Sequence, residues 1–214
     1  MGRILTGTMA KLFSILLLAT WIFFAVGAET SAEMIAWDFI GGVGNNMYLR
    51  YRNFFSDIWK RDIARCTMAT RVSMNNTDQT ATYWTKWYNT SSNMSNQVLS
   101  EYSTTGNVLT ATLHFQSGNY TFAKTNDYIF NYTDGKCAVV FTPHWDNASF
   151  PCERACEMWV REGSTDAWNE TCDTVFADVC GTRNITIYVK EHCEKIPALN
   201  RSREELQINQ CGLF

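Results

Sequence analysis

Catalytic signals are scarce in this sequence of 214 residues. It has only three histidines, His114, His144 and His192, and they are isolated from one another. There is no Gly-x-Ser-x-Gly motif, no His-Glu-x-x-His motif, no phosphate-binding loop and no dinucleotide fingerprint. Since such motifs bring a nucleophile, a metal or a cofactor to a substrate, their absence argues against an enzyme, a metal site and a bound cofactor.

Strong net charge and long apolar segments are also lacking. The formal net charge is only -3, so the chain has no excess of basic residues to hold a polyanion, and nucleic acid is not expected as a partner. After residue 28 no stretch is apolar over the roughly 20 residues that cross a bilayer. We therefore expect no membrane span in the mature chain.

The one long apolar run is Leu12–Val26, near the start of the sequence. Lys11 precedes it, and small residues end it at Gly27 and Ala28. A basic residue, a short apolar run and small residues are typical of a cleaved signal peptide. We expect residues 1–28 to be a signal peptide and residues 29–214 to form a single domain of a secreted, extracellular protein.

Eight cysteines follow the predicted signal peptide, and an even number in a secreted chain predicts four disulfides of open connectivity. Cys152 and Cys156 are separated by three residues, and no histidine pair stands at ligand spacing. This pattern favours structural bridges over a metal or redox site. The cysteines are Cys66, Cys137, Cys152, Cys156, Cys172, Cys180, Cys193 and Cys211.

Acceptor sequons for N-glycosylation are frequent. Because glycans must face solvent, these positions are expected on the outside of the fold. They are Asn75, Asn89, Asn93, Asn119, Asn131, Asn147, Asn169, Asn184 and Asn200.

Short segments rich in Thr, Val, Tyr, Phe and Trp dominate the middle of the chain. Clusters of Asn, Ser, Gly and Asp separate them at intervals of roughly ten residues, which is typical of antiparallel strands. Asp134-Gly135, between two such segments, predicts a tight hairpin of the primed type. The predicted strands are Arg65–Ser73, Thr80–Tyr88, Val98–Tyr102, Val108–Gln116, Tyr120–Thr125, Tyr128–Tyr132, Cys137–Thr142 and Asn184–Val189.

Other patterns flank these strands. Residues 33–62 read as a helical or turn-rich lid that feeds the first strand. Late in the chain, Thr171–Cys180 places Val175, Phe176 and Val179 on one face at helical spacing and predicts a helix. Residues 194–214 are polar and are expected to be a C-terminal tail.

Seven or eight antiparallel strands followed by one outer helix describe a small closed barrel, which can enclose one ligand. A flat sandwich fits the strand spacing almost as well. The late helix and an aromatic content of 14% favour the barrel.

One spacing matches a known family. Cys137-Ala138-Val139 is followed after seventeen residues by Glu157-Met158-Trp159 and after twelve more by Cys172. This pattern resembles the signature of arthropod amine-binding lipocalins, in which a Cys, an acid and an aliphatic residue precede Glu-Leu-Trp/Tyr and a Cys. The segment from Tyr48 to Cys66 is similar to the start of the tick histamine-binding proteins. The resemblance covers about Trp37 to Cys193.

The resemblance implies a mainly β, lipocalin-like, eight-stranded antiparallel barrel with an N-terminal helical lid and a C-terminal helix packed outside. It also implies a salivary protein that captures a small host inflammatory mediator, such as the biogenic amines histamine and serotonin.

A buried protonated amine needs a carboxylate partner, and aromatic faces add to its binding. Carried over by position, the implied ligand-binding residues are Asp57, Glu101, Glu157, Trp159 and Phe54. Two plainer roles compete with these: Trp159 as a core residue and Glu101 as a solvated charge at a strand end.

Two departures from the signature bear on the ligand. Ala138 stands where the family has an acid, and Met158 replaces Leu. The missing acid leaves a more apolar cavity, so a leukotriene, a fatty acid or cholesterol is an alternative ligand. A protein that acts on complement or on host immune cells is a further alternative.

The resemblance also implies bridges. Cys66–Cys193 and Cys137–Cys172 are the two pairs typical of the family. For the other four cysteines we expect Cys156–Cys180 and Cys152–Cys211.

Overall fold

The computed structural model describes residues 36–55, 63–117, 120–148, 154–163 and 170–196. In chain order its elements are α2 (Ala36–Ile40), β1 (Asn46–Arg52), β2 (Ala64–Asn75), β3 (Thr80–Asn89), β4 (Met94–Thr105), β5 (Val108–Ser117), β6 (Tyr120–Thr133), β7 (Cys137–Phe141), the 3-10 helix η1 (Pro143–Ala148), β8 (Cys156–Arg161), α3 (Glu170–Cys180), β9 (Ile185–Thr186) and α4 (Lys190–Cys193). The predicted signal peptide and most of the predicted tail lie outside the described residues.

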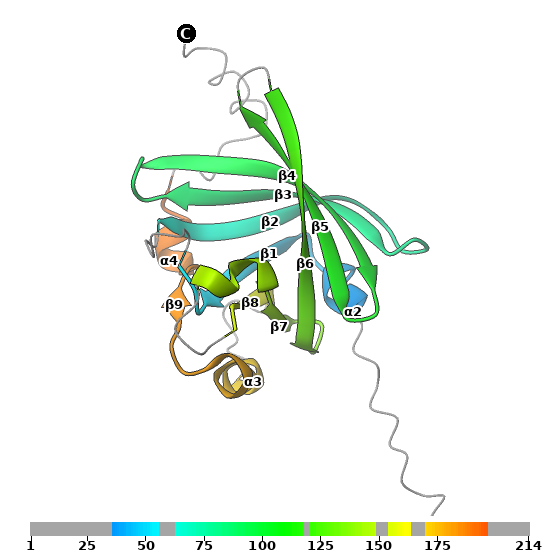
Figure 1. The fold of residues 1–214 in the computed structure, drawn as a ribbon, viewed down its shortest axis with the longest axis vertical. Helices are drawn as coiled ribbons and strands as arrows, with labels where there is room; N and C mark the ends of the chain where they lie inside the picture. Colours follow the sequence, from blue (N-terminus) through cyan, green and yellow to red (C-terminus); the bar gives the residue numbers. More distant parts are fainter. Residues whose placement is uncertain (1–35, 56–62, 118–119, 149–153, 164–169, 197–214) are drawn as a thin grey trace, which may run out of the picture. The chain divides into compact units, whose positions relative to one another are not determined.

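The strands form a closed antiparallel barrel (Figure 1). The sheet order runs from β2 through β8 to β1, and β1 also pairs with β2, which joins the two edges. Strand β9 adds two residues beside β1. The predicted mainly β, eight-stranded barrel is confirmed, and the alternative of a flat sandwich is wrong. Every helix of the described ranges is too short to cross a membrane.

Three predicted elements differ in detail. Tyr120–Thr125 and Tyr128–Tyr132 form one strand, β6, because the polar residues between them suit the sheet: Asn126 is buried, and the Asp127 carboxylate accepts a hydrogen bond from the Thr110 hydroxyl at 2.8 Å. Strand β8 was not predicted as a strand. The predicted strand Asn184–Val189 contributes only the two residues of β9.

The turn between β6 and β7 is not of the primed type. A type I′ turn needs positive φ at both central residues, but of Asp134 and Gly135 only Gly135 has it, at 79°. Instead, Asp134 Oδ1 accepts the backbone N–H groups of Lys136 and Cys137, at 2.8 and 2.9 Å. The Asp side chain therefore takes over hydrogen bonds that a two-residue hairpin would make through its backbone.

Helix α3 lies outside the barrel against β7 and β8, as predicted, but its buried face is different. Cys172, Phe176 and Cys180 are buried, whereas Val179 is 38% exposed. Disulfides join Cys172 to Cys137 of β7 and Cys180 to Cys156 of β8. These two bridges set the rotation of the helix and turn Val179 to solvent.

A third disulfide, Cys66–Cys193, links β2 to α4. These three pairs are the ones expected from the sequence. The fourth expected pair, Cys152–Cys211, lies outside the described residues.

The predicted lid, residues 33–62, is described over residues 36–55. Its part Asn46–Arg52 is strand β1 of the barrel, so the prediction is wrong there, whereas α2 lodges in one end of the barrel. Its residues Ala36, Phe39 and Ile40 are almost fully buried in the main core cluster, together with inward side chains of the strands. The helix thus closes this end of the barrel and forms part of the core.

Polar side chains of the barrel wall bind the end of α2. The buried Arg161 of β8 donates from Nε to the Phe39 carbonyl and from Nη2 to the Ile40 carbonyl, both at 2.8 Å. The Tyr83 hydroxyl also donates to the Ile40 carbonyl, at 2.7 Å. Gly42 follows, where a Cβ atom would lie 2.9 Å from the Asp38 carbonyl oxygen and 3.0 Å from Arg161 Nε, so a larger residue would crowd the backbone and the guanidinium. The last carbonyls of the helix, which have no partners within it, are satisfied by the wall.

We predict that Arg161→Met lowers the free energy of unfolding by about 3 kcal/mol or more, because it removes two buried, charge-assisted hydrogen bonds to the Phe39 and Ile40 carbonyls. Guanidinium chloride denaturation of the oxidised protein measures this change. Arg154→Met, which removes an exposed arginine, is the matched control and should change stability by less than about 0.5 kcal/mol. A loss below about 1 kcal/mol for Arg161→Met would contradict the role given to this side chain.

Candidate ligand-binding site

The interior of the barrel holds a cavity of about 290 Å³. Its wall is mainly apolar and aromatic, and only two of the described lining side chains, Arg52 and Glu157, are charged. The lining residues are Phe39, Ile40, Met47, Leu49, Arg52, Phe54, Ala64, Thr67, Thr85, Trp87, Val98, Tyr102, Leu109, Leu113, Phe115, Tyr128, Phe130, Val140, Trp145, Glu157 and Trp159. An apolar cavity with a few polar groups is the usual form of a small-molecule site.

Strand alternation places Glu157 and Trp159 inside. Successive side chains of a strand point to opposite faces, so Glu157, Trp159 and Arg161 of β8 face the barrel interior. Met158 and Val160 point the other way and pack in the cluster beneath α3. The alternating sequence of β8 therefore separates the ligand wall from the packing face.

Glu157 is a buried carboxylate held by its neighbour. It is 7% exposed, and its Oε2 accepts a hydrogen bond from Trp159 Nε1 at 2.8 Å. Burial raises the pKa of Glu157 to about 7, while the Trp159 hydrogen bond and the charge of Arg52 act in the opposite direction. Near neutral pH this carboxyl group can be present in either protonation state.

Aromatic rings line the cavity together with the Glu157 carboxyl group. Phe54 stacks on Trp145 of η1 with ring centroids 5.4 Å apart. Burial raises the pKa of Tyr102 to about 12 and that of Tyr128 well above its usual value, so both hydroxyls stay neutral. Among the described residues, the site therefore offers ring faces and neutral hydroxyls around one carboxyl group.

A register shift in β1 brings Arg52 and Phe54 into the cavity. Met47 and Leu49 face inward, and strict alternation would continue with Tyr51. The pairing of β1 with β8 shifts between Leu49 and Tyr51, so the inward positions become 52 and 54. Tyr51 packs instead outside the barrel, with its ring centroid 6.1 Å from that of Phe176.

Three of the five predicted site residues meet in this cavity: Phe54, Glu157 and Trp159. Asp57 lies outside the described residues. Glu101 does not belong to the cavity. It points outward from β4 and is 59% exposed, because the inward positions of that strand are Val98 and Tyr102 on the even numbers.

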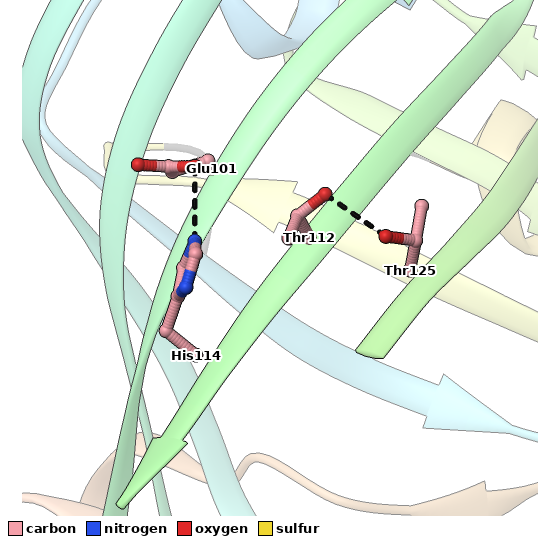
Figure 2. A network of polar contacts seen from close by, with 4 residues as sticks. All are labelled: Glu101, Thr112, His114 and Thr125. Carbon is pink, nitrogen blue, oxygen red and sulfur yellow. Dashed lines mark hydrogen bonds and ion pairs between the residues drawn. The ribbon is translucent and has the colours of Figure 1, made fainter. Parts of the chain in front are cut away.

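Figure 2 shows Glu101 on the outer face of the barrel with His114 of β5. His114 Nε2 and Glu101 Oε2 are 2.9 Å apart, and a hydroxyl pair of Thr112 and Thr125 lies beside them. Of the two roles considered for Glu101, the structure places it as a solvated strand charge. His114, which is 41% exposed, is likewise a surface residue and not a pocket residue.

Ala138 is fully buried in the main core and does not line the cavity. The position at which the family signature carries an acid is therefore packed and apolar here. Glu157 is left as the one carboxylate of the cavity among the described residues.

One group of potential metal ligands lies elsewhere in the described residues: Asp134, Cys137 and Cys172. The two cysteines are bridged to each other, so they offer no thiolate to a metal.

Sequence reasoning missed several residues of the cavity. Tyr102 and Tyr128 could have been found from the alternation in their strands, since both stand among inward apolar residues. Arg52 carried no such signal, because an arginine in a strand ordinarily faces solvent. Trp145 lies in a 3-10 helix that was not predicted.

Comparison with known proteins identifies the family. The family model described as tick histamine-binding protein matches residues 27–195. The chain belongs to the tick histamine-binding protein family. Members of this family bind ligands and are not enzymes. None of the curated protein sequences matches the chain.

Among solved structures, one with a TM-score above 0.5 shares the lipocalin-like fold, at low sequence identity. The structure of AM182 in complex with serotonin is 15% identical, covers 77% of this chain and 96% of its own, and has a TM-score of 0.51. Japanin from Rhipicephalus appendiculatus bound to cholesterol is 12% identical over 68% of this chain and 94% of its own, with a TM-score of 0.48. The amine-binding protein of Rhodnius prolixus with tryptamine is 12% identical over 81% and 93%, with a TM-score of 0.46.

We predict that Glu157 titrates in the free protein with a midpoint near pH 7, because burial disfavours its charged form. NMR of protein carrying ¹³C-labelled glutamate carboxyl groups measures this midpoint, and Glu157→Gln assigns the signal. A Glu157 midpoint below about pH 5.5 would contradict the described burial.

Proposed function

We propose that this family member is a secreted protein that sequesters a small host inflammatory mediator, with a biogenic amine such as serotonin or histamine as its ligand. The observation that carries the proposal is the buried Glu157 carboxyl group among aromatic rings. Sequestration is stoichiometric, so affinity and protein abundance set the effect. The three disulfides support an extracellular location.

The physical reason lies in the cost of burying a charge. An ammonium group that leaves water must find a fixed anion, and Glu157 is such a group once it is ionised. Trp159 holds one carboxylate oxygen and offers an aromatic edge to the same region. Rings of Tyr102 and Tyr128 can add cation–π contacts, each of about 0.5–2 kcal/mol.

Cavity size also favours an amine. Small-molecule sites commonly measure about 300–1,000 Å³, so the cavity of about 290 Å³ is at the small end. A one- or two-ring amine suits this volume better than a sterol does. The AM182 structure, which shares the fold, is a serotonin complex and supports serotonin as a first probe.

An apolar ligand, such as a leukotriene, a fatty acid or a sterol, is the second candidate. The observation that favours it is the mainly apolar wall, together with Ala138 in place of the acid of the family signature.

Two parts of the proposal rest on the resemblance and the sequence. Asp57 is proposed as a second counterion. Glycans are proposed at the nine sequons, and the six described sequon asparagines do not line the cavity. Asn75, Asn93, Asn147 and Asn184 are exposed, while Asn89 and Asn131 are partly exposed.

We predict that Glu157→Gln weakens serotonin binding by well over tenfold, because removing the partner of a buried cation costs about 2–5 kcal/mol. Calorimetric titration at pH 8 measures the effect. Glu101→Gln removes a carboxylate from the outer face of the same barrel and should leave affinity unchanged within about twofold. Asp57→Asn tests the second proposed counterion in the same way.

The same experiment separates the two candidates. If the wild-type protein binds neither serotonin nor histamine but binds a leukotriene or cholesterol, the amine proposal is wrong and the second candidate replaces it. In that case Glu157→Gln should hardly change affinity, since apolar area supplies most of the binding free energy.

We also predict that serotonin binds about tenfold more tightly at pH 8 than at pH 6. Above pH 7 Glu157 is ionised and the amine binds directly; below pH 7 the carboxyl carries a proton that the amine must displace. The serotonin ammonium stays charged over this range, as a lysine does. Calorimetry in buffers of different ionisation enthalpy should detect release of nearly one proton at pH 6 and little at pH 8. An affinity independent of pH would show that Glu157 is not the counterion.

A further inference from the structure

A group of hydroxyl side chains forms a second polar region of the cavity, on the wall made by β3 and β4. Thr85 of β3 and Tyr102 of β4 line the cavity. Ser100 of β4 is fully buried, and its hydroxyl oxygen is 3.0 Å from that of Thr85. Burial raises the pKa of Tyr102, while hydrogen bonding from Thr85 and Ser100 acts in the opposite direction, so the three hydroxyls lie together. We call Thr85, Ser100 and Tyr102 the hydroxyl cluster.

The strands hold the hydroxyl cluster in place. Side chains alternate along a strand, so Ser100 and Tyr102 both face inward from β4. The Tyr102 ring also stacks on the ring of Tyr83, with centroids 5.1 Å apart. The Tyr83 hydroxyl is bound to the Ile40 carbonyl, so it fixes the ring of Tyr102 without joining the cluster.

The hydroxyl cluster can accept a further hydrogen bond. Each hydroxyl has one donor and two acceptor positions, so bonds within the cluster can use every donor and still leave acceptor positions open. The hydroxyl hydrogens can also rotate toward a new partner. Since the cluster carries no formal charge, its natural partner is a neutral hydroxyl group, whereas an ammonium group needs the carboxylate.

The hydroxyl cluster and Glu157 lie on opposite walls of the cavity. In the eight-stranded barrel, β4 is four strands away from β8 in either direction, through β5, β6 and β7 or through β3, β2 and β1. The cavity between them measures only about 290 Å³, so a ligand that fills it meets both walls. A ligand with an apolar end at the cluster would leave the open acceptors without a donor.

We infer that the preferred ligand is an aromatic amine with a hydroxyl group on its ring, bound with its ammonium group at Glu157 and its hydroxyl at Thr85 and Tyr102. The inference rests on the proposed function in taking Glu157 as the counterion of an amine. It adds Thr85 and Tyr102 as residues that determine specificity among amines of similar size.

Serotonin and tryptamine test this inference, because they share the indole ring and the aminoethyl chain and differ only in one ring hydroxyl. Calorimetry with the wild-type protein at pH 8 should give serotonin an affinity about tenfold above that of tryptamine, since tryptamine leaves polar groups of the site unpaired.

Variants of the cluster should reduce this preference. Thr85→Val and Tyr102→Phe each remove a hydroxyl and nearly conserve side-chain size. Each should weaken serotonin binding by about fivefold or more and leave tryptamine binding within about twofold, whereas a general disturbance of the barrel would weaken both. If Tyr102→Phe does not fold, Thr85→Val gives the same test.

Thr112→Val is the matched control. Thr112 and Thr125 form a similar pair of hydroxyls on neighbouring strands, 3.1 Å apart, but on the outer face of the barrel (Figure 2). This variant should preserve the wild-type preference for serotonin.

The outcomes distinguish this inference from the proposed function. Affinity for tryptamine equal to or above that for serotonin, with Glu157→Gln weakening both, overturns the inference and leaves the amine proposal intact. A preference for serotonin that survives both Thr85→Val and Tyr102→Phe also overturns the inference, because the hydroxyl then binds elsewhere. If serotonin, tryptamine and histamine all fail to bind, the amine proposal is wrong and the inference fails with it.

Discussion

Pairing of β1 on both of its edges is the constraint on which this structure depends. One edge is hydrogen-bonded to β8, and the other is shared between β2 and β9. The β1–β2 ladder covers only residues 46–48 of β1, so the seam of the barrel is short. Beyond it, Ile187 joins the two strands: its backbone N–H donates to the Arg50 carbonyl, and its carbonyl accepts from Cys66, both at 2.8 Å. The Cys66–Cys193 disulfide fastens the same place covalently.

Closure of the barrel forms the cavity and also raises the pKa of the carboxyl group inside it. With no open edge, the inward side chains of all eight strands share a single enclosed space, and α2 closes one end of it. Water is largely excluded from the Glu157 carboxyl group, which is why its pKa rises to about 7 despite the nearby Arg52.

The two helices that pack on the barrel are attached in different ways, one by disulfides and the other by buried hydrogen bonds. The outer helix α3 is a short amphipathic segment, and two disulfides at its two ends fix it to β7 and β8. At the inner helix α2, no disulfide is present among the described residues, and Arg161 and Tyr83 bind its terminal carbonyls instead. Both attachments are buried, but the outer one is covalent, whereas the inner one depends on hydrogen bonds that burial strengthens.

Much of the architecture could be predicted from the sequence. Short segments of alternating β-forming residues, separated by turn residues, predicted the strands of β2 to β7, and helical periodicity predicted α3. The spacing of Cys137, Glu157 and Cys172 indicated the family and placed Glu157 and Trp159 at the site. These features are local patterns or fixed spacings along the chain, so they can be recognised without knowing how the chain folds.

Only the tertiary structure decided which charged side chains face the cavity. Period-2 alternation from Leu49 predicts Tyr51 inside and Arg52 outside, and the shift in the β1–β8 pairing reverses this. Glu101 matched a ligand position to within one residue, but one residue along a strand is the difference between the cavity and solvent. The physical reason is that a strand alternates its side chains with every residue, so the face of each position depends on pairing with a partner strand far away in the chain.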